Sequence, residues 1–362
     1  MPHEERSLSS YSLAALESWA ATERLPRFRA RQLHEAIFKR AAQEFDEITE
    51  LPAALRSQIQ MTHALRSLHV RLHLASKDGA QKVLFGLQDG LTVETVLIRK
   101  GTDDSQRNTV CVSSQVGCPA GCSFCATGLN GLARNLTAEE IADQVFYFAH
   151  WLRERGDRVT NVVYMGMGEP LLNVRAVRQS IGTLTDPSGF NLGSRRITVS
   201  TVGIVPQIQR FGEWAGQVNL AVSLHAPNEQ LRRSLVPYNE HFPIHAILAA
   251  AREYSSSTRR RVSFEYVLLR GVNDTPNLAR ELAALLRPLG GMAHVNLIPW
   301  NPFREGRFVR SEGPDAERFA QEVQRGGVNA TVRYSKGLDI SAACGQLREQ
   351  VSRDTTKTSS AR

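Results

Sequence analysis

The 362-residue chain has few cysteines and no long apolar run. Five cysteines in a chain of this length are too few, and odd in number, for the disulfide framework of a small secreted protein. No stretch approaches the roughly 20 apolar residues of a membrane span, and the N-terminal segment lacks the apolar core of a signal peptide. The sequence therefore predicts a cytoplasmic protein of a reducing compartment, with no membrane partner and no feature that demands more than a monomer.

Three of the cysteines form one CxxxCxxC loop at Cys118, Cys122 and Cys125. Three thiolates at this spacing can hold three irons of a [4Fe-4S] cluster and leave the fourth iron free to bind a small molecule. Structural zinc is the rival interpretation, but it usually needs a second CxxC or HxxxH pair, and none lies nearby in the sequence. Phe124, between the last two cysteines, can shield a metal from water. The loop favours a cluster over zinc.

The chain is basic, with 44 Lys and Arg against 36 Asp and Glu and a formal net charge of +8. This surplus favours a polyanionic partner such as nucleic acid, although many soluble proteins without such a partner are also basic. A hydrophobic content of 42% is ample for a core. The length suggests one large domain with a smaller companion.

The patterning divides the chain into four regions. Residues 1–70 predict a helical module, because apolar positions recur at three-to-four spacing. Residues 71–106 predict a linker and a β-hairpin with a turn at its centre. Residues 107–350 alternate six β-rich runs, and a candidate terminal strand, with amphipathic helices, which indicates an α/β fold with a partial (β/α)6 barrel. Residues 351–362 have almost no apolar side chains and predict a disordered tail.

Small polar groups follow several of the predicted barrel strands, at the edge where a barrel binds its ligand. In the segment MGMGEPLLN, Gly166 and Gly168 let a ligand approach the backbone, and Glu169 offers a carboxylate to an ammonium group. Each further candidate, taken alone, is equally well explained as a turn residue. These candidates are Ser200, Ser223, Leu224, His225 and Asn301.

Three other residues stand apart from these groups. Glu94 lies in the middle of a predicted strand, where a carboxylate is either the polar face of an edge strand or an acid/base group. Cys111 and Cys344 are isolated thiols, for which burial among apolar side chains is the commoner fate in cytosolic proteins.

Seven ordered segments resemble the RlmN/Cfr family of radical S-adenosylmethionine (SAM) RNA methyltransferases. The resemblance covers nearly the whole chain except the extreme N-terminus and the last ten or so residues. It rests on the segments CVSSQVGCPAGCSFCATG, GLARNLTAEEI, MGMGEPLLN, SLHAPNEQLR, VNDTPN, VNLIPWNPF and DISAACGQL.

The resemblance implies a role for each candidate. Cys344 matches the cysteine that carries the transferred methyl group, Cys111 matches the thiol that resolves the protein–RNA adduct, and Glu94 matches the acid/base carboxylate. The three loop cysteines match the ligands of a [4Fe-4S] cluster, and two SAM molecules are used per turnover. Contacts to SAM are implied for Gly168, Glu169, Ser200, Ser223, Leu224, His225 and Asn301.

The same resemblance implies the partners. The substrate would be 23S ribosomal RNA, with transfer RNA as a second candidate, and an electron donor such as flavodoxin or ferredoxin would reduce the cluster. The segment RFRARQLHEAIFKR resembles the RNA-contacting accessory domain of the family, although its basic residues are equally typical of a solvated helix face.

The position of methylation on the adenine is less clearly indicated. CATGLNGLARNLT and TDPSGFNLGSRR are closer to the subgroup that methylates carbon 8, whereas IPWNPF and MGMGEPLLN are closer to the subgroup that methylates carbon 2. Leu338 stands where the carbon 2 subgroup has an acid. Carbon 2 is favoured as the commoner activity. A non-catalytic, metal-containing RNA-binding module is the remaining alternative, and it would leave the two isolated cysteines without roles.

Overall fold

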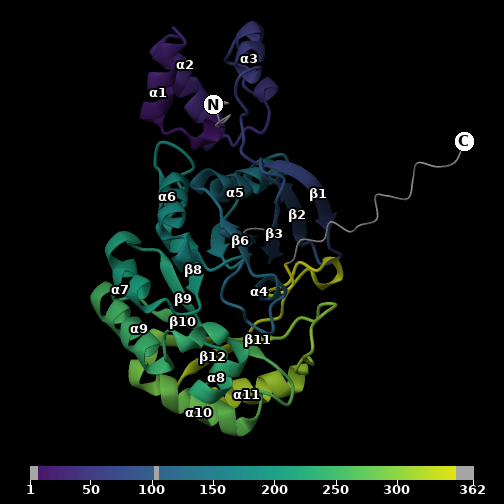
Figure 1. The fold of residues 1–362 in the computed structure, drawn as a ribbon, viewed down its shortest axis with the longest axis vertical. Coiled ribbons are helices and arrows are strands. Elements are labelled where there is room, and N and C mark those ends of the chain that lie inside the picture. Colours follow the sequence, from purple (N-terminus) through teal and green to yellow (C-terminus); the bar gives the residue numbers. More distant parts are fainter. Residues whose placement is uncertain (1–6, 102–105, 348–362) are drawn as a thin grey trace, which may run out of the picture.

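The computed structural model describes residues 7–101 and 106–347, and its centre is one mixed sheet (Figure 1). In this part of the chain ten strands form the sheet, in the order β1-β2-β3-β4-β7-β8-β9-β10-β11-β12. None of the described helices is both long and apolar enough to cross a membrane. The predicted tail at 351–362 lies outside the described residues.

Seven of these described strands run parallel and carry helices between them, which confirms the predicted partial barrel. Short runs of β-branched and apolar residues form the strands, and longer amphipathic segments return the chain to the next strand. The strands are β4 (Arg107–Cys111), β7 (Asn161–Tyr164), β8 (Ile197–Thr201), β9 (Asn219–Ser223), β10 (Val262–Leu268), β11 (Ala293–Pro299) and β12 (Asn329–Val332). The helices are α5 (Ala138–Arg153), α6 (Val174–Thr185), α7 (Val205–Trp214), α8 (Glu229–Leu235), α9 (Ile244–Thr258), α10 (Pro276–Leu286) and α11 (Gly313–Arg325).

The predicted hairpin is present as β2 (Gln81–Gly86) and β3 (Thr92–Lys100), and it continues the barrel sheet. A further strand, β1 (His69–Ala75), pairs antiparallel with β2 and was not predicted. Its side chains alternate between apolar and polar, but much of the strand is exposed, so burial gives little signal there. A separate two-stranded sheet joins β5 (Gln115–Gly117) to β6 (Leu132–Asn135) and holds the short helix α4 (Ala126–Leu129) between them.

The N-terminal part of the chain is helical, as predicted, with α1 (Leu13–Thr22), α2 (Arg27–His34) and α3 (Ala53–Gln60). One π turn, η2 (Glu35–Lys39), continues α2. The short 3-10 turns are η1 (Leu8–Ser10), η3 (Phe45–Glu47), η5 (Pro170–Leu172), η6 (Ser194–Arg196), η7 (Pro237–Glu240), η8 (Arg287–Met292) and η9 (Leu338–Ile340).

A buried carboxylate on α5 joins the helical part to the barrel. Asp143 accepts a hydrogen bond from the Arg66 guanidinium at 2.9 Å and from the Ser9 hydroxyl at 2.8 Å. The Ser67 backbone N–H and hydroxyl each donate to it at 2.7 Å. Arg66 also lies over the Phe146 ring, 4.7 Å from its centroid. Charge-assisted bonds of this kind between buried groups hold the two parts in one arrangement.

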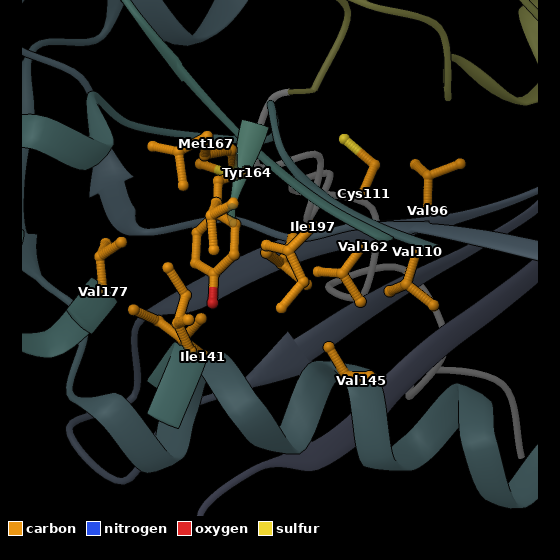
Figure 2. Close-up of a cluster of buried hydrophobic side chains, with 14 of the residues drawn as sticks. Val96, Val110, Cys111, Ile141, Val145, Val162, Tyr164, Met167, Val177 and Ile197 are labelled. Carbon is orange, nitrogen blue, oxygen red and sulfur yellow. The ribbon is translucent and has the colours of Figure 1, made fainter. Parts of the chain in front are cut away.

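The two faces of the sheet have different surroundings, as the alternation of side chains along a strand requires. Figure 2 shows Val110 and Val162 directed toward Ile141 and Val145 of α5, in a tightly packed apolar layer. Cys111, the residue after Val110, points to the opposite side of the sheet. The packing on α5 therefore fixes the strand register that turns the Cys111 thiol away from the helix and toward the interior of the barrel.

Candidate active site

The three cysteines of the sequence motif line one cavity at the carboxyl ends of the parallel strands. The loop that carries them starts with a tight turn. Gly117 has a φ of +79°, and a Cβ atom there would lie 2.0 Å from the carbonyl oxygen of Gly131. Only glycine permits this approach, which lets the Cys118 N–H donate to the same oxygen over 2.7 Å. The close pairing of β5 with β6 thus presents the first cysteine to the cavity.

Most of the predicted SAM contacts form the rest of the cavity wall. Leu224 differs, because it is fully buried and does not line the cavity; its backbone N–H donates to the carbonyl oxygen of Glu265 at 3.0 Å. The Ser200 and Ser223 hydroxyls, on neighbouring strands, lie 3.2 Å apart. The residues that line the wall are Gly168, Glu169, Ser200, Ser223, His225 and Asn301.

Glu169 is held by backbone groups on both of its oxygens. Oε1 accepts from the N–H of Leu171 at 2.9 Å, and Oε2 accepts from the N–H of Val202 at 2.7 Å. Burial nevertheless raises the pKa of Glu169 to about 7. A cationic group at the cavity would restore the ionised form of this carboxyl, as expected for a residue that binds an ammonium group.

His225 is strained and neutral. Its φ of +61° lies in the left-handed region, where non-glycine residues are uncommon. Nδ1 accepts from the Val267 N–H at 3.0 Å, which places the ring hydrogen on Nε2. Burial lowers the pKa of His225 to about 3, and its ring packs edge-on against Phe124 with centroids 4.7 Å apart. The cavity thus has a neutral hydrogen-bond donor beside the cysteine loop.

Two charged residues at the site were not predicted from the sequence. Glu265 lines the cavity from β10, accepts from Asn296 at 2.8 Å, and has a pKa raised by burial to about 7. The sequence signal that could have identified Glu265 is an acidic residue inside an apolar strand, which is the same signal that identified Glu94. Arg232 is buried and donates to the carbonyl oxygens of Leu224 and Ser223 at 3.1 and 3.2 Å. The positive charge of Arg232 acts to lower the pKa of Cys122. The position of Arg232 in the sequence gave no indication of this role.

The electrostatics of the cysteine loop fit a cationic metal group. Burial raises the pKa of Cys118 to about 12 and that of Cys122 well above its usual value, so thiolates there need positive charge beside them. Among the described residues, no three His, Cys, Asp or Glu side chains are arranged to hold a single metal ion. A [4Fe-4S] cluster binds each thiolate through a different iron and leaves one iron open, so it suits three cysteines at one cavity better than zinc, which usually takes a fourth protein ligand in a structural site.

Cys344 connects this cavity with a second one. It lines both, together with Met165 and Ile298, and the second cavity also contains Cys111. Burial is the main cause that raises the pKa of Cys111, and a Cys344 thiolate raises it further, so the two thiols interact. Cys344 is exposed at the cavity surface, yet the surrounding protein raises its pKa to about 11. All five cysteines are free thiols.

Glu94 is buried in β3 and does not line either cavity. Its Oε1 is 2.9 Å from the Nζ of Lys82 on β2. Val96, two residues along β3, pairs with both Cys111 and Lys82 in the sheet register. Since side chains two residues apart share a face, Glu94, Lys82 and Cys111 all project from the same side of the sheet.

The loop that carries Cys344 is tied to the turn between β1 and β2. Lys82 Nζ donates to the Ser341 carbonyl oxygen at 3.2 Å, and Asp78 accepts from the Gly337 N–H at 2.8 Å. Asp339 accepts from the Ser76 hydroxyl and from the Lys77 N–H. Leu338, by contrast, is 41% exposed. The departure from the carbon 2 subgroup pattern at Leu338 therefore falls on a side chain that faces solvent, beside an aspartate that holds the loop.

The loop is held from the other side by residues of the cofactor cavity and the cysteine loop. Asn301 donates to the Cys344 carbonyl oxygen at 3.0 Å and to the Ser335 hydroxyl at 2.9 Å. The Ala126 N–H donates to the Gly345 carbonyl oxygen at 2.8 Å, directly after the third cysteine of the motif. The backbone of Cys344 is thus fixed relative to both the cysteine loop and the cavity wall.

A partial barrel with a three-cysteine loop at its carboxyl edge defines the class of radical SAM enzymes. The family model described as the radical SAM superfamily matches residues 112–282. A crystal structure of a radical SAM methyltransferase from Sphaerobacter thermophilus is similar, with a TM-score of 0.89 and 49% identity, covering 94% of this chain and 99% of that chain.

Curated relatives identify the family. The chain is 47% identical to a probable dual-specificity RNA methyltransferase RlmN from Thermosynechococcus vestitus, covering 93% of this chain and 97% of the relative. It is also 47% identical to a protein of the same name from Gloeobacter violaceus, covering 95% of each. The chain therefore belongs to the RlmN/Cfr family of radical SAM RNA methyltransferases. As an enzyme of this family it uses a [4Fe-4S] cluster and SAM, with two SAM molecules per turnover.

Proposed function

We propose that this enzyme methylates carbon 2 of an adenosine in 23S ribosomal RNA through a methyl group carried on Cys344. The observation that carries the proposal is the place of Cys344, which lines both the cavity of the cysteine loop and the adjoining cavity that contains Cys111. A methyl carrier must reach both the donor and the acceptor. Cys344 is the described thiol that borders both spaces.

The proposed roles of the chain's residues follow their positions. Cys118, Cys122 and Cys125 hold the cluster, and Glu169 and Asn301 face SAM with Gly168, Ser200, Ser223 and His225. Leu224, which the resemblance also implies as a SAM contact, is buried and does not line the cavity. When bound at the cluster, SAM supplies a methyl group and, on reductive cleavage, a radical that removes hydrogen from carbon. The amidine carbons of adenine are not nucleophilic, so radical addition from a protein-bound methylene group is the chemistry that the target requires.

Cys344 and Cys111 then divide the protein chemistry between them. Cys344 accepts the first methyl group, loses a hydrogen from it and forms the new bond to the adenine. The adduct would pass its ring proton to Glu94 and its unpaired electron to the cluster. The Cys111 thiolate would then attack the Cys344 sulfur, and the departing carbon would take up a proton to become the methyl group, which releases the methylated RNA and leaves a disulfide. Two electrons from a donor such as flavodoxin or ferredoxin return both thiols for the next turnover.

Further proposals concern the partners and the parts of the chain. The relatives carry the name dual-specificity RNA methyltransferase, which supports transfer RNA as a second substrate. The helical residues 1–70 would contact RNA, residues 71–106 would supply the hairpin that bears Glu94, and residues 107–350 would hold the cofactors. The enzyme would act as a monomer in the cytoplasm.

Analysis of the RNA product tests the proposal. Ribosomal RNA lacking the modification is incubated with the reconstituted enzyme, SAM and a reductant, digested to nucleosides and compared by mass spectrometry with 2-methyladenosine and 8-methyladenosine standards. The expected product co-elutes with 2-methyladenosine. An 8-methyladenosine product would reassign the enzyme to the other activity, and a fully loaded cluster that forms neither nucleoside nor 5′-deoxyadenosine would point to a binding module.

A further inference from the structure

Among the described residues, the charged side chains that line the second cavity are all positive. Lys100 at the end of β3, and Arg333 and Lys336 after β12, supply its charged side chains, and no acidic residue is among the described residues that line it. Its inner wall contains Cys111 and Cys344. Three cations around these two thiols would attract an anion to the place where, under the proposed function, the methyl group is delivered.

The cationic groups form no ion pair among the described residues, and hydrogen bonds hold two of them in place. Arg333 donates Nε to the Asn296 Oδ1 atom at 3.0 Å, which orients the guanidinium, and neither terminal nitrogen has a bonding partner within the described ranges. Lys336 donates to the carbonyl oxygen of Asp78 at 3.1 Å, which uses one of its three N–H bonds. Lys100 forms no ion pair with any residue that the structure describes. Such oriented donors suit phosphate oxygens.

An aromatic side chain stands at the same place. Tyr334 lines the second cavity and is 55% exposed, so its ring is accessible to a ligand. Its hydroxyl donates to Glu317 of α11 at 3.3 Å, so the ring is held from its far end. Proteins that bind unpaired nucleotides place aromatic rings against the bases and cations against the phosphates.

We propose that the second cavity is the entry site for the target nucleotide, in which Lys100, Arg333 and Lys336 bind backbone phosphates of an unpaired RNA segment and Tyr334 stacks on a base. This inference rests on the proposed function and assigns its substrate site. The arrangement selects a nucleotide withdrawn from a helix, because a paired adenine cannot expose its ring to a thiol at the bottom of a cavity. Specificity would then come from RNA shape around the unpaired base.

The test compares Lys100→Gln/Arg333→Gln with the wild-type enzyme. Arg252→Gln/Arg287→Gln serves as the control, because these arginines are exposed, lie on α9 and η8, and have no ion pair within the described residues. The probe is a transcribed fragment of 23S ribosomal RNA that contains the methylation site. Its dissociation constant is measured by fluorescence anisotropy over a series of salt concentrations, and KM and kcat for methylation are measured separately.

We expect the cavity variant to bind RNA about tenfold more weakly, with KM raised and kcat nearly unchanged. The slope of log affinity against log salt should fall by about 1.4, because each phosphate of an unpaired strand that a cation neutralises accounts for about 0.7. Tyr334→Ala should weaken binding by at least about fivefold, and Tyr334→Phe should restore it because the ring carries the stacking. An affinity and slope equal to those of the control would overturn the proposal.

A readout without RNA separates this proposal from the proposed function. Incorporation of one methyl group into Cys344 from SAM, and release of 5′-deoxyadenosine, should be equal in the cavity variant and the wild type. If the wild type itself failed in both, the proposed function would be wrong whatever the RNA binding showed. If the wild type showed both Cys344 methylation and 5′-deoxyadenosine release, and RNA bound equally to all variants, only the assignment of the entry site would be wrong.

Discussion

Lys82 and Glu94 form an ion pair inside the protein, with 2.9 Å between Nζ and Oε1 and both side chains almost fully buried. The same ammonium group donates to the Ser341 carbonyl oxygen, three residues before Cys344. One lysine thus contacts the proposed acid/base residue and the loop of the proposed methyl carrier. The hairpin that supplies both charged residues is therefore tied to the loop that carries Cys344.

Replacement of Lys82 by methionine should remove the ammonium group that pairs with the buried Glu94 carboxylate. We expect the free energy of unfolding to fall by about 3–5 kcal/mol and the single-turnover methylation rate to fall at least tenfold. The double variant Lys82→Met/Glu94→Gln serves as the control. Urea unfolding should show much of the stability restored in it, while methylation stays impaired. Recovery of both would mean that Lys82 acts only on stability.

Replacement of Cys344 by alanine should remove the methyl acceptor without disturbing the cluster. Mass spectrometry of the intact wild-type protein should show the addition of one methyl group, and the variant should show none and should yield no methylated RNA. Iron content and the visible absorption spectrum provide the control and should match those of the wild type. Turnover by a variant with a loaded cluster would contradict the carrier role.

Asp339 and Leu338 offer a matched pair of substitutions in the Cys344 loop. Asp339→Asn should weaken the bonds to Ser76 and Lys77, because a neutral amide is a poorer acceptor than a carboxylate. We expect faster alkylation of Cys344 by iodoacetamide and a several-fold lower methylation rate. Leu338→Asp alters an exposed neighbour and should change neither. Equal behaviour of the two variants would show that the aspartate does not hold the loop.

The pH dependence of stability should reveal Glu265. Its carboxyl has a pKa of about 7 in the folded protein against 4.5 as the usual value, so the folded state binds the proton more tightly. The stabilisation from this proton is complete below pH 4.5 and is lost as the pH rises to about 7, at a cost of about 3 kcal/mol.

Denaturation of the cluster-free protein measures this effect. Between pH 4.5 and 8 the change in unfolding free energy of Glu265→Gln should differ from that of the wild type by about 3 kcal/mol. The comparison with Glu265→Gln is needed because His225 has a lowered pKa. Its protonation makes the folded protein less stable as the pH falls below 6.5, which opposes the effect of Glu265. A difference near zero would show that Glu265 titrates normally.

Much of the architecture was predictable because the barrel strands and helices have clear periodicities. The cysteine loop and the polar residues at the strand ends also follow from the sequence, since parallel strands bring their carboxyl ends to one edge. The contact of Lys82 with Ser341 was not predictable, because it joins positions 259 residues apart. The strand β1 was missed because much of it is exposed, so its alternation carries little information about burial. Glu265 was missed although an acidic residue inside an apolar strand was an available signal.

The departure at Leu338 shows a different limit of sequence comparison. A change from acid to leucine suggests an altered site, yet in the fold the position faces solvent while Asp339 makes the contacts with the turn between β1 and β2. Which of the two adjacent side chains contacts that turn depends on the loop geometry after β12. Gly337 and Ser341 flank the short helix η9 and both have positive φ values. Tertiary contacts set this backbone geometry.

The hydrogen bonds of Asp143 with Arg66, Ser67 and Ser9 limit where the chain can be truncated. A fragment that starts after residue 70 would keep the carboxylate inside α5 but lack all three donors, at a cost of about 3–5 kcal/mol. Deletion of the helices would thus damage the catalytic half as well. Truncation at this point would therefore destabilise the barrel, and the helical segment and the barrel are expected to fold as a single unit.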